Sequence, residues 1–203
     1  QSPNRAQNIR AYYTPGAFTM QNRKDSAGIE WQLTLQTKGI YADGQLVDIP
    51  NSNAEQMVCE NVLNIKHQFF TEQYVNSQEG VRQNFIIQKA PVSTESIEVR
   101  LLASGLQFNN IDGKELHFYQ QSTCGPKKII TYNQLKVWDA CGKSLKAYFT
   151  SENDQISIIA DVRNAVYPIT IDPLSSSADW TAEINQTSAY FGTRIGTAGD
   201  VNG

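Results

Sequence analysis

The sequence predicts an all-β protein that folds as an antiparallel β-sandwich of about a dozen short strands. Apolar and polar residues alternate with a period of two in many short segments. Turn-forming residues separate these segments at intervals of roughly 8–12 residues, as is typical of sandwiches. No window of about eleven or more residues shows the 3.6-residue period of an amphipathic helix.

The alternating segments give the expected strands in chain order. In one of the clearest, Ile97 and Val99 face one side of the sheet while Glu98 and Arg100 face the other. A short helical turn is expected at residues 54–59. The expected strands are residues 9–13, 17–20, 30–35, 62–70, 72–74, 81–87, 97–103, 116–119, 135–139, 145–150, 156–161 and 167–172.

These strands make one domain, residues 9–174, preceded by a polar and flexible N-terminus at residues 1–8. Pro168 lacks an N–H group, so the last strand is expected to lie at a sheet edge or to begin irregularly. Pro173 is expected to end it. The serine run that follows predicts a linker at residues 175–188.

Composition narrows the classes of partner. The 203 residues are 40% apolar and 18% charged, which suits a folded domain, and the net charge of −3 argues against a nucleic-acid or anionic-membrane partner. No apolar run approaches the roughly 20 residues that a membrane-spanning helix needs, so no membrane insertion is expected. Gln1 is compatible with a mature end left by a signal peptidase, which would make the protein an exported one.

The three cysteines predict at most one disulfide. Their spacing matches no zinc motif, and neither His67 nor His117 lies at ligand spacing to a cysteine. In an exported protein, one disulfide and one spare thiol is the simplest arrangement. The candidate pair is Cys124 with Cys141, whose loop closure would contribute about 3 kcal/mol, although the spacing leaves Cys59 open as an alternative partner.

No catalytic constellation is visible. The two histidines are interpreted as ordinary strand residues, because no nucleophile or metalloprotease motif surrounds them. Five carboxylates show no acid–base spacing and are interpreted as solvated surface. They are Glu95, Glu98, Asp112, Glu115 and Asp139. Six aromatic residues could form a sugar-stacking platform but more often pack on a sheet face. They are Tyr12, Tyr13, Trp31, Tyr119, Trp138 and Trp180.

Two modification signals are present. Ser26, in the tripeptide Asp25-Ser26-Ala27, resembles the acceptor of a bacterial O-glycosylation system that acts on exported proteins. Asn185 begins an N-glycosylation sequon, which a bacterial origin would leave unused.

Several segments resemble the N-terminal module of bacterial secreted FG-GAP repeat proteins. They are FFTEQYVNSQEGVRQNFII (69–87), YNQLKVWDACGKSL (132–145) and AVYPITIDPL (165–174). In that family a similar Tyr-Pro segment ends the module, and the repeats follow. YFGTRIGTAGDVNG (190–203) resembles the first half of an FG-GAP, or integrin-α-like, repeat. Residues 189–203 are therefore expected to begin a β-propeller blade that this chain does not complete.

The same resemblance suggests a calcium loop. Asp200 and Asn202 could supply its first side-chain ligands, but Ca²⁺ takes six to eight oxygens, so two ligands do not make a site. We therefore expect no cofactor in this chain, and Ca²⁺ only in downstream repeats.

The function expected from these observations is a non-catalytic structural or adhesive module of a larger FG-GAP repeat protein, either extracellular or on the bacterial cell surface. Its partner would be a protein or a glycan. The alternative is a carbohydrate-binding or accessory domain of a secreted glycan-active enzyme. A row of exposed aromatic residues on one sheet face would favour this alternative.

Overall fold

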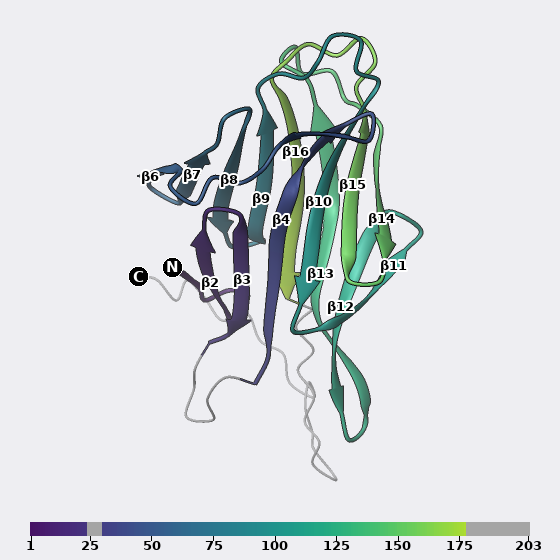
Figure 1. The fold of residues 1–203 in the computed structure, drawn as a ribbon. Helices are drawn as coiled ribbons and strands as arrows, with labels where there is room; N and C mark the ends of the chain where they lie inside the picture. Colours follow the sequence, from purple (N-terminus) through teal and green to yellow (C-terminus); the bar gives the residue numbers. More distant parts are fainter. Residues whose placement is uncertain (24–29, 178–203) are drawn as a thin grey trace, which may run out of the picture.

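The computed structural model describes residues 1–23 and 30–177, and these contain only strands and turns (Figure 1). They form two antiparallel sheets of eight strands each, which confirms the predicted β-sandwich. The first sheet has the order β1-β2-β3-β4-β10-β15-β14, with β5 paired to β4. The second has the order β11-β12-β13-β16-β9-β8-β7-β6.

The strands of the first sheet are β1 (Ser2–Asn4), β2 (Ile9–Thr14), β3 (Ala17–Asn22), β4 (Gln32–Ala42), β5 (Gln45–Asp48), β10 (Ser96–Ser104), β14 (Ala147–Glu152) and β15 (Gln155–Asp161). Those of the second are β6 (Glu55–Cys59), β7 (Val62–Lys66), β8 (Phe70–Ser77), β9 (Gly80–Ile87), β11 (Gln107–Ile111), β12 (Glu115–Ser122), β13 (Gly125–Trp138) and β16 (Ile169–Ser177).

The core lies between the two sheets and is built from every second residue of the long strands. Ile97, Val99 and Leu101 of β10 are fully buried, as the period-two pattern predicted. Phe85 of β9 and Ile171 of β16 are paired neighbours in the second sheet and are also fully buried. Each sheet thus presents one apolar face to the other, the arrangement expected of a sandwich.

The strand after Pro168 is central, so the first of the two alternatives predicted for it, a sheet edge, is wrong. The Tyr167–Pro168 peptide bond is cis, and β16 begins at the next residue, between β13 and β9. Pro173 does not end the strand either. The register with β13 shifts between Asn133 and Lys136, and the intervening Gln134 has a φ of 49°. This bulge lies opposite Pro173, so the missing N–H falls where the ladder is already interrupted.

Residues 175–177 therefore belong to the sandwich and not to a linker. Ser175 is fully buried and pairs with Tyr132 of β13 and Val81 of β9. The three serines at 175–177 predicted a linker because they are polar. Strands pair through backbone N–H and C=O groups, however, and these are the same for any side chain.

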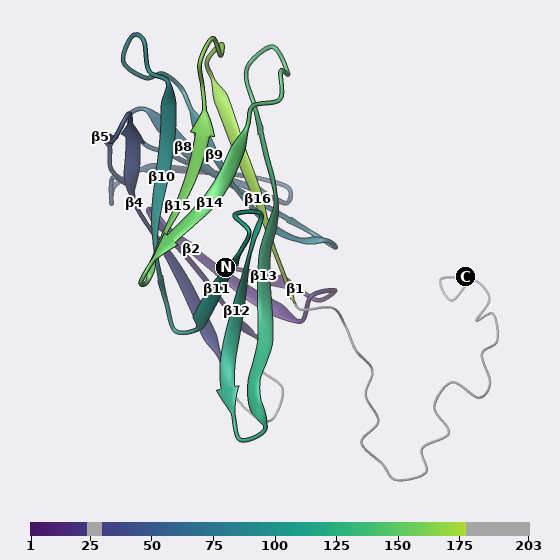
Figure 2. The same cartoon turned by 90° about the vertical axis from the view of Figure 1, so that its right-hand side faces the viewer.

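The N-terminal residues are also part of the fold, which corrects their prediction as a flexible segment. β1 pairs with β2, and the buried Asn4 side chain donates hydrogen bonds to Asn76 Oδ1 (2.8 Å) and to the Ser77 carbonyl (2.7 Å). Gln7 Oε1 accepts a hydrogen bond from the Ser177 N–H at 2.9 Å. The start of the domain and the end of β16 thus lie side by side (Figure 2).

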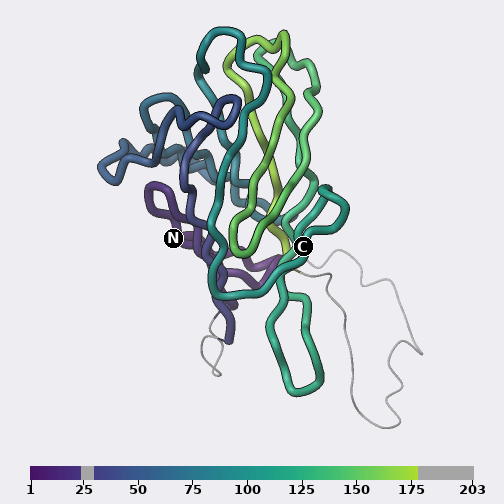
Figure 3. Tube along the Cα trace, turned by 45° about the vertical axis from the view of Figure 1, so that its right-hand side comes forward, coloured from purple at the N-terminus to yellow at the C-terminus, as the bar shows by residue number. Residues whose placement is uncertain are grey.

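Four short strands were not predicted from the sequence: β1, β5, β6 and β11. No strand was expected at β5, and β6 was expected to be a helical turn. All five residues of β6 are exposed, so the strand needs no apolar alternation and shows none. With β7 it forms a hairpin at one side of the molecule, drawn in blue in Figure 3.

Candidate functional site

A buried carboxylate, Glu72, is the centre of a polar network between the sheets. β8 alternates, and its inward face carries Phe70, Glu72 and Tyr74. All three are essentially inaccessible to solvent. Because a buried carboxylate is costly unless it accepts hydrogen bonds, its partners decide whether this position is tolerated.

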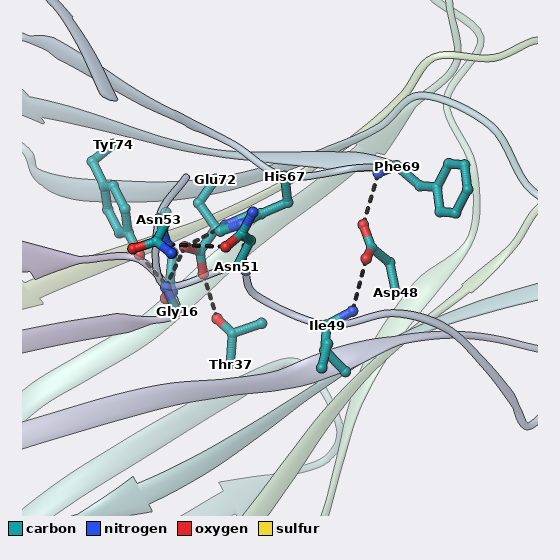
Figure 4. A network of polar contacts seen from close by, with 11 residues as sticks. Gly16, Thr37, Asp48, Ile49, Asn51, Asn53, His67, Phe69, Glu72 and Tyr74 are labelled. Atoms are coloured by element: carbon teal, nitrogen blue, oxygen red, sulfur yellow. Dashed lines mark hydrogen bonds and ion pairs between the residues drawn. The ribbon is translucent and has the colours of Figure 1, made fainter. Parts of the chain in front are cut away.

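Glu72 accepts hydrogen bonds from both sheets (Figure 4). Its Oε1 accepts from the hydroxyl of Thr37 on β4 at 2.5 Å, and its Oε2 accepts from the N–H of Gly16 in the β2–β3 turn at 2.9 Å. The Nε2 atom of His67 lies 3.2 Å from the same Oε2. The carboxylate therefore ties the second sheet, which carries it, to β4 and to the β2–β3 turn of the first.

The tautomer of His67 follows from its other ring nitrogen. Nδ1 lies 3.0 Å from the backbone N–H of Asn51, which can only donate. Nδ1 is therefore the acceptor, and the proton sits on Nε2, where it is donated to Glu72. This interaction anchors the loop between β5 and β6, which Asp48 also fastens by accepting the N–H groups of Phe69 (2.7 Å) and Ile49 (2.9 Å).

The His67–Glu72 pair has the residue types of an acid–base pair but not the exposure that catalysis requires. Both side chains are fully shielded from solvent. The Thr37 hydroxyl donates to the carboxylate and not to the imidazole, so it is not an activated nucleophile. The network thus acts as a polar connector between the sheets.

A second buried polar chain lies beside it. The Tyr132 hydroxyl donates to Gln83 Oε1 (3.0 Å), and Gln83 Nε2 donates to the Tyr74 hydroxyl (3.4 Å). Burial raises the pKa of both tyrosines well above their usual value of about 10. For Tyr74 the charge of Glu72 adds to this effect, and for Tyr132 the charge of Asp172 does.

Folding stability should therefore fall at high pH. Because the folded-state pKa of Tyr74 and Tyr132 lies above the unfolded value, their contribution is fully present below about pH 10 and is lost as the pH rises through the folded pKa. Urea unfolding at a series of pH values from about 8 upward measures the loss, and Tyr132→Phe should reduce it. Equal losses in the variant and the parent protein would contradict this assignment.

A surface pocket of about 590 Å³ lies beside the β11–β12 turn. Tyr148, which is 49% exposed, and Leu135 line its apolar part. Asp112 and Glu115 line its polar part. Asn133 also lines it, and its buried Oδ1 accepts no hydrogen bond from the residues that the structure describes. An exposed ring next to carboxylate and amide groups could hold a small polar ligand.

The carboxylates noted in the sequence do not form one cluster, although Asp112 and Glu115 line the same pocket. Glu98 binds Arg100 (2.8–2.9 Å), and this hydrogen bonding holds the pKa of Glu98 below its usual range. Glu115 contacts His117 Nε2 at 3.0 Å, and Glu95 is exposed. Asp139 is not solvated surface as predicted. It is 3% exposed and accepts the N–H groups of residues 141, 143 and 166, so it fastens the turn after β13.

The aromatic residues noted in the sequence do not form a row. Tyr12 and Tyr13 lie on β2 of the first sheet, whereas Tyr119 and Trp138 lie on β12 and β13 of the second. Tyr13 stacks on Phe18 and contacts Tyr74, so it packs between the sheets. These four described residues therefore do not assemble a sugar-stacking platform.

The predicted disulfide is absent. Cys124 lies in the β12–β13 turn and Cys141 in the turn after β13, and both are free and exposed. A 14-residue strand, β13, separates them, which spans roughly 45 Å, whereas a disulfide needs Cα atoms within about 7 Å. Cys59, on β6, is also free.

Several predicted sites lie outside the described residues. These are the glycosylation candidate Ser26, the sequon at Asn185, the ring of Trp180 and the calcium candidates Asp200 and Asn202. Within the part of the chain that is described, no group of three or more His, Cys, Asp or Glu side chains could hold a metal ion.

Sequence reasoning missed Glu72, Thr37 and His67 as one network. One signal was present, because Glu72 stands between Phe70 and Tyr74 with the parity of an inward face. A charged residue in that position predicts a buried partner. The partners themselves come from other segments and carry no local signature.

Comparison with family models, with curated proteins and with solved structures found no match. Among the described residues there is no helix with the length and hydrophobicity that crossing a membrane requires.

Proposed function

We propose that the chain is a non-catalytic structural or adhesive module of a larger FG-GAP repeat protein, located outside the cell or on the bacterial cell surface. The observation that supports a non-catalytic role is the burial of the His67–Glu72 pair, which is sealed from any substrate. The link to FG-GAP repeats rests on the resemblance of residues 190–203 to the first half of such a repeat.

The positions of the two ends of the sandwich support a pendant arrangement. Gln7 and Ser177 are joined by a hydrogen bond, so the two ends of the described sandwich lie next to one another. A module with adjacent ends is attached to the rest of the protein at one end only. Its opposite end and its sides are then accessible to partners. This suits adhesion better than it suits a spacer, which would need its ends far apart.

Labelling of intact bacteria tests this proposal. An antibody raised against residues 1–177 should label intact cells of the producing bacterium, or bind protein in the culture medium, without permeabilisation. An antibody against a cytoplasmic protein is the control and should label permeabilised cells only. Labelling that requires permeabilisation for both antibodies would overturn the proposed location.

A second candidate function is carbohydrate binding, and the pocket beside the β11–β12 turn favours it. Saccharides combine apolar faces, which stack on rings such as Tyr148, with hydroxyl groups that bind carboxylates and amides. Retention of the protein on an immobilised glycan, lost in Tyr148→Ala and kept in Tyr41→Ala on the same sheet, would favour this function over a purely structural one.

A further inference from the structure

The edge strands of the two sheets differ in how they are protected. β1 has three residues, includes Pro3, and is held to β8 through Asn4. β14 donates the Phe149 N–H to the Gly113 carbonyl of the β11–β12 turn, and Asn110 of β11 donates to the Phe149 carbonyl. β14 and the end of β11 therefore cover one another, and β1 is short and interrupted. These are the usual ways in which proteins block edge-to-edge pairing.

β6 has none of these protections. Within the described residues, no hydrogen bond from another element reaches its outer edge, and the strand contains no proline, lysine or bulge. Its central residues are apolar and solvent-exposed, Met57 at 59% and Val58 at 72%. The strand lies at the outer end of the second sheet, clear of the first (Figure 1). Its outer row of N–H and C=O groups is therefore available for another strand.

The inner face of the second sheet continues to this edge as an apolar row. Val58 pairs with Leu63 of β7, and Leu63 pairs with Tyr74 of β8, which is buried in the core. Exposure rises along the row, from 1% at Tyr74 through a half-buried Leu63 to 72% at Val58. The first sheet thus leaves the last residue of the row uncovered, and an added strand would shield it.

We propose that a second copy of this chain pairs with β6, antiparallel and with the two-fold axis at Met57. This register places Met57 opposite Met57 of the second copy, Gln56 opposite Val58, and Glu55 opposite Cys59. Charge favours this register. Glu55, the only charged residue of β6, then lies opposite the neutral Cys59 of the second copy and still pairs with Lys66 on β7. A shift by one residue in one direction would place Glu55 opposite Glu60, and like charges directly opposite are unfavourable.

The pairing would be weak in solution. It joins two five-residue strands, and interfaces below about 1,200 Å² belong to transient complexes. Disulfide trapping is the appropriate measurement, because it accumulates a transient pair and reports its register. The proposal does not depend on the proposed surface function, since it concerns only this edge.

The test uses the full chain with Cys124→Ser and Cys141→Ser, under mild oxidation. With Cys59→Ser added, Met57→Cys should form a covalent dimer at least about ten-fold faster than Val58→Cys, because only position 57 faces its own copy. Glu55→Cys should form a dimer with Cys59 retained and not with Cys59→Ser. Positions 55 and 59 lie roughly 13 Å apart on one strand and do not bond within a chain.

Charge provides the control for specificity. Met57→Lys, added to the Glu55→Cys protein that retains Cys59, should abolish the dimer because two lysines would meet at the axis. Val92→Lys, at an exposed apolar residue between β9 and β10, should leave it unchanged. Equal rates for Met57→Cys and Val58→Cys, or no dimer from Met57→Cys and Glu55→Cys, would overturn the proposal. All substituted side chains are exposed, so the variants should fold.

Discussion

Glu72→Ala should lower the free energy of unfolding by about 3–5 kcal/mol. The substitution leaves three buried donors without an acceptor: the Gly16 N–H, the Thr37 hydroxyl and the His67 Nε2–H. Each such donor costs about 1–3 kcal/mol when water is excluded. The carboxylate also joins the two sheets. Without it, only apolar packing holds the sheets together at this position. Urea unfolding followed by circular dichroism measures the difference.

Two companion variants separate this effect from a general sensitivity to substitution. Glu152→Ala, at an exposed position at the end of β14, should change stability by less than about 0.5 kcal/mol. Thr37→Val removes one of the three donors together with its bond and should cost about 1–2 kcal/mol. A loss below about 1 kcal/mol for Glu72→Ala would show that the remaining donors find other partners.

Gly105→Ala should lower the free energy of unfolding by a similar amount, about 2–5 kcal/mol, because the added Cβ atom meets the backbone. Gly105 follows β10 with a φ of +96°, a conformation that L residues rarely adopt. A Cβ atom there would lie 2.1 Å from the Gln32 carbonyl oxygen, at the first residue of β4. Because that oxygen belongs to the backbone, relief requires β4 and β10 to move apart at the end of their pairing.

Gly44→Ala is the matched control. Gly44 has a φ of +79° in the β4–β5 turn, but a Cβ atom there would meet nothing within 4 Å. Only the conformational cost remains, about 1–2 kcal/mol. The difference between the two variants measures the steric overlap. Equal losses would mean that backbone conformation alone explains both.

Local alternation was sufficient to predict most of the long strands. β2, β10 and β15 each show apolar residues at every second position, and each lies close to its expected range. The alternation identifies a strand because it reflects one buried and one exposed face. β6 has no buried face, and so the same reasoning could not find it.

Prolines show the limit of reading residues one at a time. Pro173 cannot donate to a ladder, and on this basis alone it should end a strand. In the structure a bulge at Gln134, 39 positions earlier in the sequence, removes the need for its N–H. The same reasoning offered a sheet edge as one alternative for the strand after Pro168, but Pro168 stands immediately before a central strand.

By itself, the sequence determined the all-β class, the buried faces of the longer strands and most of the turns between them, because these depend on residues that are close neighbours along the chain. Only the tertiary structure decided the strand order, the ordered ends and the partners of Glu72. Of those partners, Gly16 and Thr37 lie 56 and 35 residues from Glu72 in the sequence. The pairing of β16 with β13 and β9 likewise joins segments that are far apart in the sequence. Such contacts arise from the packing of two whole sheets, so no short segment encodes them.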